Sequence, residues 1–152
     1  MRHPSDSQAQ RDAEAFVLAE LSRQEGVIIA PASVRLGDGP AVDVDGFNEA
    51  HRFVCEVYAH IGRTRGAQNH KVAHDILKLW AIERFCGGGW QKFLCFVDAE
   101  ARQAAANDSW LAWLCKSLGI EARLVPLSPA LREAVSEAQQ KQVMVNRRES
   151  GA

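Results

Sequence analysis

The sequence predicts a single α/β domain whose core is a mixed five-stranded sheet flanked by helices. Three segments with strand character follow a first helix without interruption, which indicates an antiparallel meander. Strand and helix patterns then alternate to the end of the chain, which indicates parallel strands joined by crossover helices. A length of 152 residues suits one hydrophobic core, and no internal repeat or linker divides residues 1–152.

The first half of the chain is expected to form one helix and the three-stranded meander. Apolar residues at helical spacing predict a helix over about residues 6–24, and Gly26 supplies its end. The segment VIIAPASVRL is typical of a bent strand or an edge strand, because Pro31 cannot donate to a ladder. The turn GDGP leads into a second strand, AVDVDGF, and a turn over 48–52 leads into a third, RFVCEVYAHI.

A basic loop over 62–66 and a long helix over about 67–85 connect the meander to the fourth strand. Val72, Ile76 and Leu79 give this helix its apolar face, and three consecutive glycines end it. The near-continuous apolar run KFLCFVD then predicts a strand that is covered on both faces.

Two helices and a fifth strand complete the expected order, α-β-β-β-α-β-α-β-α. Apolar spacing predicts a helix over about 109–118, and the strand ARLVPL follows it. A serine–proline pair at 128–129 is a strong start signal for a last helix, which is expected to run to about Val145. Residues 1–5 and 147–152 are expected to be flexible tails.

Composition excludes several classes of protein. A formal net charge of -1 gives no global basic field, although six Lys or Arg and three His accompany only two acids between His60 and Lys92. This local excess suits a polyanionic substrate or, equally, a solvated helix face. The four cysteines form no C-x-x-C pair, so free thiols are expected rather than a zinc site. The chain shows no signal peptide and no membrane-spanning run, and we expect a cytoplasmic protein without membrane contact.

The third expected strand carries an unusual polar face. Phe53, Cys55, Val57, Ala59 and Ile61 fall on one side and belong in a core, and the opposite side presents a carboxylate, a phenol and an imidazole, from Glu56, Tyr58 and His60. We expect this polar side to face water, where three such groups in a row predict a site rather than ordinary solubilising residues.

The second expected strand ends in a candidate partner for Glu56. Asp45 lies at the end of this strand beside a permissive glycine, and strand parity puts Asp43 on the same face. Two carboxylates on neighbouring strands repel each other unless a cation lies between them. The pattern therefore predicts a metal site made by Asp45 and Glu56, with Asp43 as the reserve ligand.

The stretches VDG at 44–46 and EVY at 56–58, followed by the helix QNHKVAHDILKL, resemble the PD-(D/E)XK or restriction-endonuclease-like superfamily. The longer stretch EVYAHIGRTRGAQNHKVAHDILKL resembles a group of small uncharacterised bacterial proteins built on that core. The resemblance covers roughly residues 41–98. It implies an αβββαβ core and a metal-dependent nuclease, in which Asp45 and Glu56 would hold Mg²⁺ or Mn²⁺.

The resemblance also implies a lysine two positions after the glutamate, and this chain has Tyr58 there. A phenol carries no positive charge and is a poor base at neutral pH. Members of the superfamily are known to move this lysine onto the following helix, and Lys71 is the replacement we expect here. His60 is the alternative group for positioning water, and Tyr58 stays a candidate catalytic residue.

Nucleic acid, DNA more than RNA, is the expected partner. Arg63 and Arg65 in the basic loop would meet the phosphate backbone, and Lys78 would add a further contact. Gln68 at the start of the long helix would contact phosphate or act as a simple capping residue. Lys78 also shares a helix face with Lys71 and Asp75, which equally predicts a ladder of salt bridges.

The sequence also allows other functions and other roles for some of these residues. The loss of the lysine at Tyr58 favours a catalytically inactive domain that binds nucleic acid or protein. His70 and His74 are spaced to chelate a soft metal, although a surface pair is the more common outcome. Trp110 and Trp113 would stack bases, pack in the core or form a homodimer contact, and packing or dimerisation is the safer expectation. A Cys–His hydrolase has least support, since no cysteine lies in a loop or at a helix start.

Overall fold

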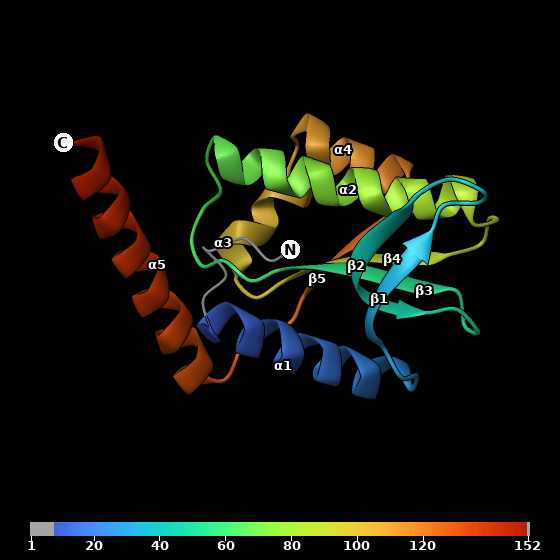
Figure 1. The fold of residues 1–152 in the computed structure, drawn as a ribbon, viewed down its shortest axis with the longest axis horizontal. Coiled ribbons are helices and arrows are strands. Elements are labelled where there is room, and N and C mark those ends of the chain that lie inside the picture. Colours follow the sequence, from blue (N-terminus) through green and yellow to red (C-terminus); the bar gives the residue numbers. More distant parts are fainter. Residues whose placement is uncertain (1–7, 152) are drawn as a thin grey trace.

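A computed structural model describes residues 8–151 and confirms an α/β fold with a mixed five-stranded sheet between helices (Figure 1). In chain order the elements are α1 (Gln8–Glu25), β1 (Ala30–Arg35), β2 (Ala41–Asn48), β3 (Phe53–Tyr58), α2 (Ala67–Phe85), β4 (Gln91–Phe96), α3 (Ala99–Arg102), η1 (Gln103–Ala105), α4 (Trp110–Ser117), β5 (Ile120–Leu124) and α5 (Pro129–Ser150).

The strands lie in the sheet in the order in which they occur in the chain, β1-β2-β3-β4-β5. The first three form the expected antiparallel meander, and β3, β4 and β5 run parallel to one another. Pro31 lies in β1, an edge strand, where its missing N–H costs no ladder bond. β3 is the central strand, so both of its edges are paired.

Two segments differ from the sequence-based expectation. The short helices α3 and η1 follow β4 and were not predicted, because four and three residues are too few to carry a helical period. The last helix continues to Ser150 where a tail was expected from residue 147, since no proline or glycine interrupts the chain before Gly151. The other expected tail, 1–5, lies outside the described residues.

Helices cover both faces of the sheet. On one face α1 packs against alternate residues of β3 and β4, α5 packs beside α1, and the core there includes Val17, Leu21, Cys55, Val57 and Val135. On the other face α2 and α4 pack against the remaining residues, and that core includes Val54, Tyr58, Ile76, Leu79 and Leu111. The hydrophobic effect of these two layers is the main force that holds the helices on the sheet.

The expectation that the polar face of the third strand faces water is wrong. Every residue of β3 is buried, Glu56 and Tyr58 included, because α2 crosses directly over that face. A central strand with a parallel neighbour needs a crossover helix, and such helices cover the second face of the sheet. The alternation in β3 therefore separates two buried environments, and Glu56 is a carboxylate inside the protein.

β2 contains a β-bulge at the position of the candidate aspartates. Ala32 pairs with Val44 and Ala30 pairs with Phe47, so β2 advances by three residues where β1 advances by two. Val44 and Phe47 consequently both pack in the core beneath α2, which strict alternation forbids. Asp43 precedes the bulge, on the opposite side of the strand from the buried Val44. Asp43 is exposed and pairs with Ser33 at the outer edge of the meander.

Glycine is the one residue type that fits at position 46, in the bulge. A Cβ atom there would lie 2.4 Å from the Cys55 sulfur and 2.7 Å from Cγ2 of Ile29. We expect Gly46→Ala to lower the free energy of unfolding by about 1–3 kcal/mol, because the well-packed core must shift to accept a methyl group. Gly88→Ala is the control, since a Cβ there meets only Glu83 Oε1 at an ordinary 3.6 Å. Urea denaturation measures both variants, and equal stabilities would contradict the close packing.

Two further findings concern the whole described range. All four cysteines are free, as expected, and Cys55, Cys95 and Cys115 are buried. Within residues 8–151 no helix is both long enough and apolar enough to cross a bilayer.

Candidate functional site

Asp45 and Glu56 lie side by side where β2 and β3 separate. The ladder between these strands pairs Gly46 with Cys55. One step further on, the Asp45 backbone N–H donates to Glu56 Oε2 at 2.9 Å, and the Val57 N–H donates to Asp45 Oδ2 at 2.8 Å. Each carboxylate thus takes the place of a backbone carbonyl, so the two side chains are fixed by the strands themselves.

Lys78 of α2 provides the cation of the site. Its Nζ lies 2.6 Å from Glu56 Oε1, and the Lys78 side chain is 22% exposed where that of Glu56 is 1% exposed. The ammonium therefore lies between the buried carboxylate and solvent. A buried carboxylate is expected to be paired with a cation in this way, because isolation in a core is costly.

Lys71, the residue expected to replace the missing lysine, does not contact Glu56. Its Nζ lies 3.5 Å from Asp75 Oδ2 and 5.6 Å from the ring centroid of Tyr58, and its side chain is 58% exposed. Lys71 and Lys78 are two helical turns apart, and α2 runs back over β3, so Lys71 lies above the end of the strand. The contact with Glu56 thus belongs to Lys78, for which we had expected a role in binding nucleic acid.

Asp75 is a third acid at the site, and sequence reasoning assigned it only to a salt-bridge ladder. It is 4% exposed and lies between the two lysines on the inner side of α2. Its position three residues after Val72 and four before Leu79 places it within the apolar stripe, and that spacing is the signal that could have identified it. We call these five side chains the acid–lysine cluster: Asp45, Glu56, Lys71, Asp75 and Lys78.

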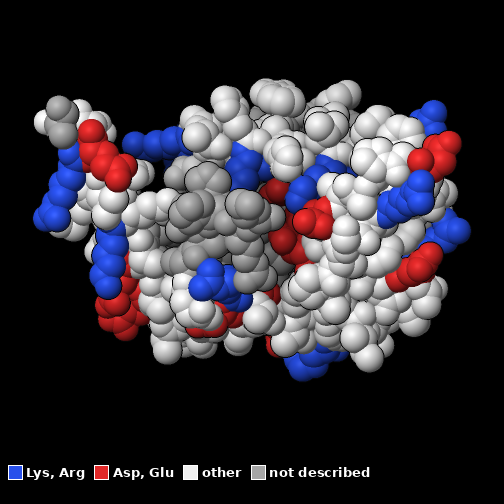
Figure 2. All heavy atoms as spheres, viewed as in Figure 1, with Lys and Arg blue, Asp and Glu red and all other residues white. Residues whose placement is uncertain are grey.

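The acid–lysine cluster opens onto a groove of about 990 Å³ between α1, the β1–β2 hairpin and α2. In Figure 2, acidic and basic atoms gather near the middle of the face where these elements meet. Asp45 and Asp75 line the groove beside both lysines, and Arg11 of α1 lies on the facing wall. Glu56 does not line it, because this residue lies beneath Lys78. A ligand in the groove would therefore meet Asp45, Asp75 and two ammonium groups first.

Burial changes the proton affinities of the cluster. The pKa of Glu56 is raised to about 9, first by burial and then by the carboxylates of Asp45 and Asp75, which outweigh the lowering by Lys78. Burial also raises the pKa of Asp75. Burial by itself would lower the pKa of Lys78, but the neighbouring carboxylates, Glu56 above all, raise it. At neutral pH the cluster therefore holds a proton that separate, solvated side chains would have released.

Tyr58 and His60 lie away from the groove. Tyr58 is buried, its ring stands 5.7 Å from that of Phe96, and its hydroxyl has no hydrogen-bond partner among the described residues. Burial raises the pKa of Tyr58 to about 12, so this phenol stays protonated. His60 Nε2 lies 3.1 Å from Nε2 of Gln68, and burial lowers the pKa of His60. Neither residue lines the groove.

The other expected contact residues are dispersed over the surface. Arg63 lines a second cavity, and Arg65 is exposed in the same loop. Gln68 Oε1 accepts from the Arg65 N–H at 3.0 Å, so Gln68 holds the loop that precedes the helix and does not cap the helix itself. His70 and His74 are both exposed. Among the Lys and Arg residues between positions 60 and 92, only two lie at the cluster.

The cluster suits a hard divalent cation only in part. In the part of the chain that the structure describes, no three Asp, Glu, His or Cys side chains are placed to enclose a metal ion. Mg²⁺, however, typically takes one or two carboxylates and completes its shell with waters and substrate phosphate. The two carboxylates of Asp45 and Glu56 are the kind of ligand that meets this requirement, and they do not fit a soft metal.

Comparison of the chain with known protein families, with curated proteins and with solved structures gives no match.

Proposed function

We propose that this protein is a metal-dependent nuclease of the restriction-endonuclease-like, PD-(D/E)XK kind, which hydrolyses phosphodiester bonds of nucleic acid with Mg²⁺ or Mn²⁺. One observation carries the proposal. Asp45 and Glu56 interlock across β2 and β3, and the ammonium of Lys78 reaches Glu56 at 2.6 Å from the following helix. These are two acids and a lysine in contact, with the lysine supplied by α2 in place of Tyr58.

Each residue has a defined part in this proposal. Asp45 and Glu56 would hold the cation, with Asp75 as a further oxygen donor from α2. When bound, the ion supplies charge neutralisation at the phosphate and lowers the pKa of an attacking water. Lys78 is protonated, so it cannot be the base, and its ammonium instead attracts phosphate oxygens into the groove. Lys71 lies further along the same wall and would contact the nucleic-acid backbone.

Glu56 also couples cation binding to proton release. Because its pKa is raised to about 9, the carboxyl holds a proton near neutral pH. A divalent cation needs the ionised carboxylate, so binding expels that proton and becomes tighter as the pH rises toward 9.

The second candidate is a catalytically inactive domain of the same kind, which binds nucleic acid or protein. The contact between Lys78 and Glu56 favours it as well, because an ammonium that neutralises a buried carboxylate removes the need for a metal ion. Exposed Trp113 on α4 and Met144 on α5 are consistent with a homodimer, which stays a prediction.

Calorimetric titration with Mn²⁺ at pH 8 separates the two candidates. For the nuclease we expect saturable binding that Asp45→Asn weakens by about tenfold or more, because a first ligand is lost. Asp43→Asn is the matched control, since Asp43 lines the same groove but pairs with Ser33 on β1. It should bind Mn²⁺ within about twofold of the unmodified protein. Absence of saturable binding, with or without an oligonucleotide present, would favour the inactive domain.

A further inference from the structure

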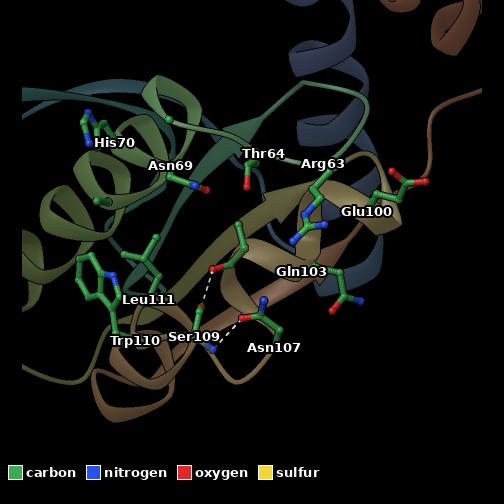
Figure 3. A pocket seen from close by; sticks show the side chains of 13 residues that line it. Arg63, Thr64, Asn69, His70, Glu100, Gln103, Asn107, Ser109, Trp110 and Leu111 are labelled. Carbon is green, nitrogen blue, oxygen red and sulfur yellow. Dashed lines mark hydrogen bonds between the residues drawn. The ribbon is translucent and has the colours of Figure 1, made fainter.

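A second cavity, of about 370 Å³, lies on the opposite flank of α2 from the groove (Figure 3). The loop after β3, the first turns of α2, the segment η1 and the start of α4 enclose it. From α2 it receives Asn69, His70 and Ala73, whereas the groove receives Lys71, Asp75 and Lys78. The volume is within the range of small-molecule sites. The cavity therefore shares no lining residue with the groove, and a ligand in it can be tested separately from the proposed function.

The cavity is lined by polar side chains that have no partner within residues 8–151. Thr64 is 9% exposed, its hydroxyl makes no hydrogen bond, and Figure 3 shows it directed into the space between Asn69 and Leu111. The side-chain amides of Asn69 and Gln103 are also without hydrogen bonds in that range. Hydrogen-bonding groups that line a cavity and have no protein partner are available to a polar ligand. These groups are arranged to bond a polar ligand.

One end of the cavity is positive. α2 is 19 residues long, its N-cap Gly66 makes no side-chain cap, and its first turn has no acidic residue, so the helix dipole there is uncompensated. Arg63 lies next to this turn without an ion-pair partner within the described range, and its guanidinium points into the cavity in Figure 3. The Gly62 N–H donates to Asp98 Oδ2 at 3.0 Å and fixes this loop. Glu100 on the opposite wall restricts an anion to the side of α2.

The other end is aromatic. Trp110 begins α4, is 69% exposed and lines the cavity together with Ala73, Ala104 and Leu111. An exposed indole in a cavity that also holds the unpartnered amide of Asn69 is suited to a nucleobase, since the ring stacks on the base and the amide bonds its edge. Base stacking was one of the roles that the sequence allowed for Trp110. Packing in the core, another of those roles, is wrong, because the side chain is exposed.

We propose that this cavity binds one nucleotide, with its base stacked on Trp110, the base edge bonded by Asn69, and its phosphate at Arg63, beside which Gln103 lies in Figure 3. Thr64 would bond the ligand from the floor of the cavity. The nucleotide is either a free mononucleotide or one unit of a single strand, because both present a base and a phosphate.

Isothermal titration in EDTA tests this binding without any cleavage, using 5′-AMP, adenosine, inorganic phosphate and a six-nucleotide deoxyadenosine strand. We expect saturable binding of AMP. Adenosine and phosphate should each bind at least about tenfold more weakly, since each lacks the group that fills one of the two subsites. Trp110→Ala should weaken AMP binding by about tenfold or more. The strand binds more tightly than AMP if the natural ligand is single-stranded, and no more tightly if it is a free nucleotide.

Two matched variants make the test decisive. Trp113 lies on the same helix and is equally exposed at 69%, but it does not line the cavity, so Trp113→Ala should leave AMP binding unchanged. Arg63→Gln should weaken AMP binding but not adenosine binding, and Arg65→Gln should weaken neither. Equal effects of the two tryptophan variants, or no saturable binding up to about 10 mM nucleotide, would overturn the proposal. Since Asp45 and Glu56 play no part, its failure would leave the nuclease proposal untouched.

Discussion

Replacing Lys78 by methionine is expected to reduce metal-dependent cleavage by about 100-fold or more. The ammonium of Lys78 touches Glu56 and faces the groove, so it is the positive group best placed to stabilise negative charge on a phosphate. Methionine keeps the length and apolar character of the side chain but removes that charge. Initial rates on a single-stranded and a supercoiled DNA substrate, with Mn²⁺ at pH 8, measure the loss.

Lys71→Met is the matched control for this measurement. Lys71 lies on the same helix and lines the same groove, but its Nζ contacts Asp75 rather than Glu56. We expect the variant to keep its turnover and to weaken substrate binding only, by about threefold to tenfold. If Lys71→Met abolished turnover and Lys78→Met did not, the assignment of the lysine would be reversed. If neither changed a measurable rate, the activity would come from another site.

Substituting Glu56 by glutamine is expected to remove most of the pH dependence of stability. The folded protein holds the Glu56 proton up to a pKa of about 9, whereas the unfolded chain releases it near 4.5. Between these values the folded state binds more protons, so stability falls as the pH rises. The contribution is fully present below pH 4.5 and fully lost above about pH 9.

Glutamine has nearly the same shape and cannot ionise. We therefore expect Glu56→Gln to match the unmodified protein at pH 5 and to be more stable at pH 9, by about 2–4 kcal/mol. The pKa of about 9 already includes the stabilisation of the ionised carboxylate by Lys78, and in the variant this partly exposed side chain can turn toward the groove. Asp75, whose pKa is also raised, leaves a small slope in the variant.

Guanidinium denaturation of both proteins between pH 5 and pH 9 measures the difference. Parallel stability curves would mean that Glu56 ionises at its ordinary pKa, and the burial argument would then be wrong. A variant that is less stable at every pH would mean instead that the carboxylate is ionised throughout and that Lys78 depends on it. At pH 9 we predict a more stable variant, and a carboxylate that is ionised throughout gives a less stable one, so the sign of the difference separates these two cases.

The sequence predicted the part of the site that lies on the strands. Asp45 and Glu56 were expected to be neighbours, because a short turn fixes the pairing of β2 with β3, and they are joined by hydrogen bonds. The bulge at Gly46 was not predicted, although the extra residue shifts the alternation between Val44 and Phe47. Alternation placed Asp43 and Asp45 on one side of the strand, and both line the groove, but Asp45 is the one that bonds to β3.

The sequence by itself determined the order of the five strands and the four longer helices α1, α2, α4 and α5, the mixed sheet, and the two acids that meet between β2 and β3, because periodicity, turns and caps act over a few residues. Only the tertiary structure decided that Glu56 is buried and that Lys78, rather than Lys71, reaches it. The rotation and translation of α2 on the sheet settle both points, and these depend on packing between residues far apart in the chain. Local sequence carries no measure of that fit.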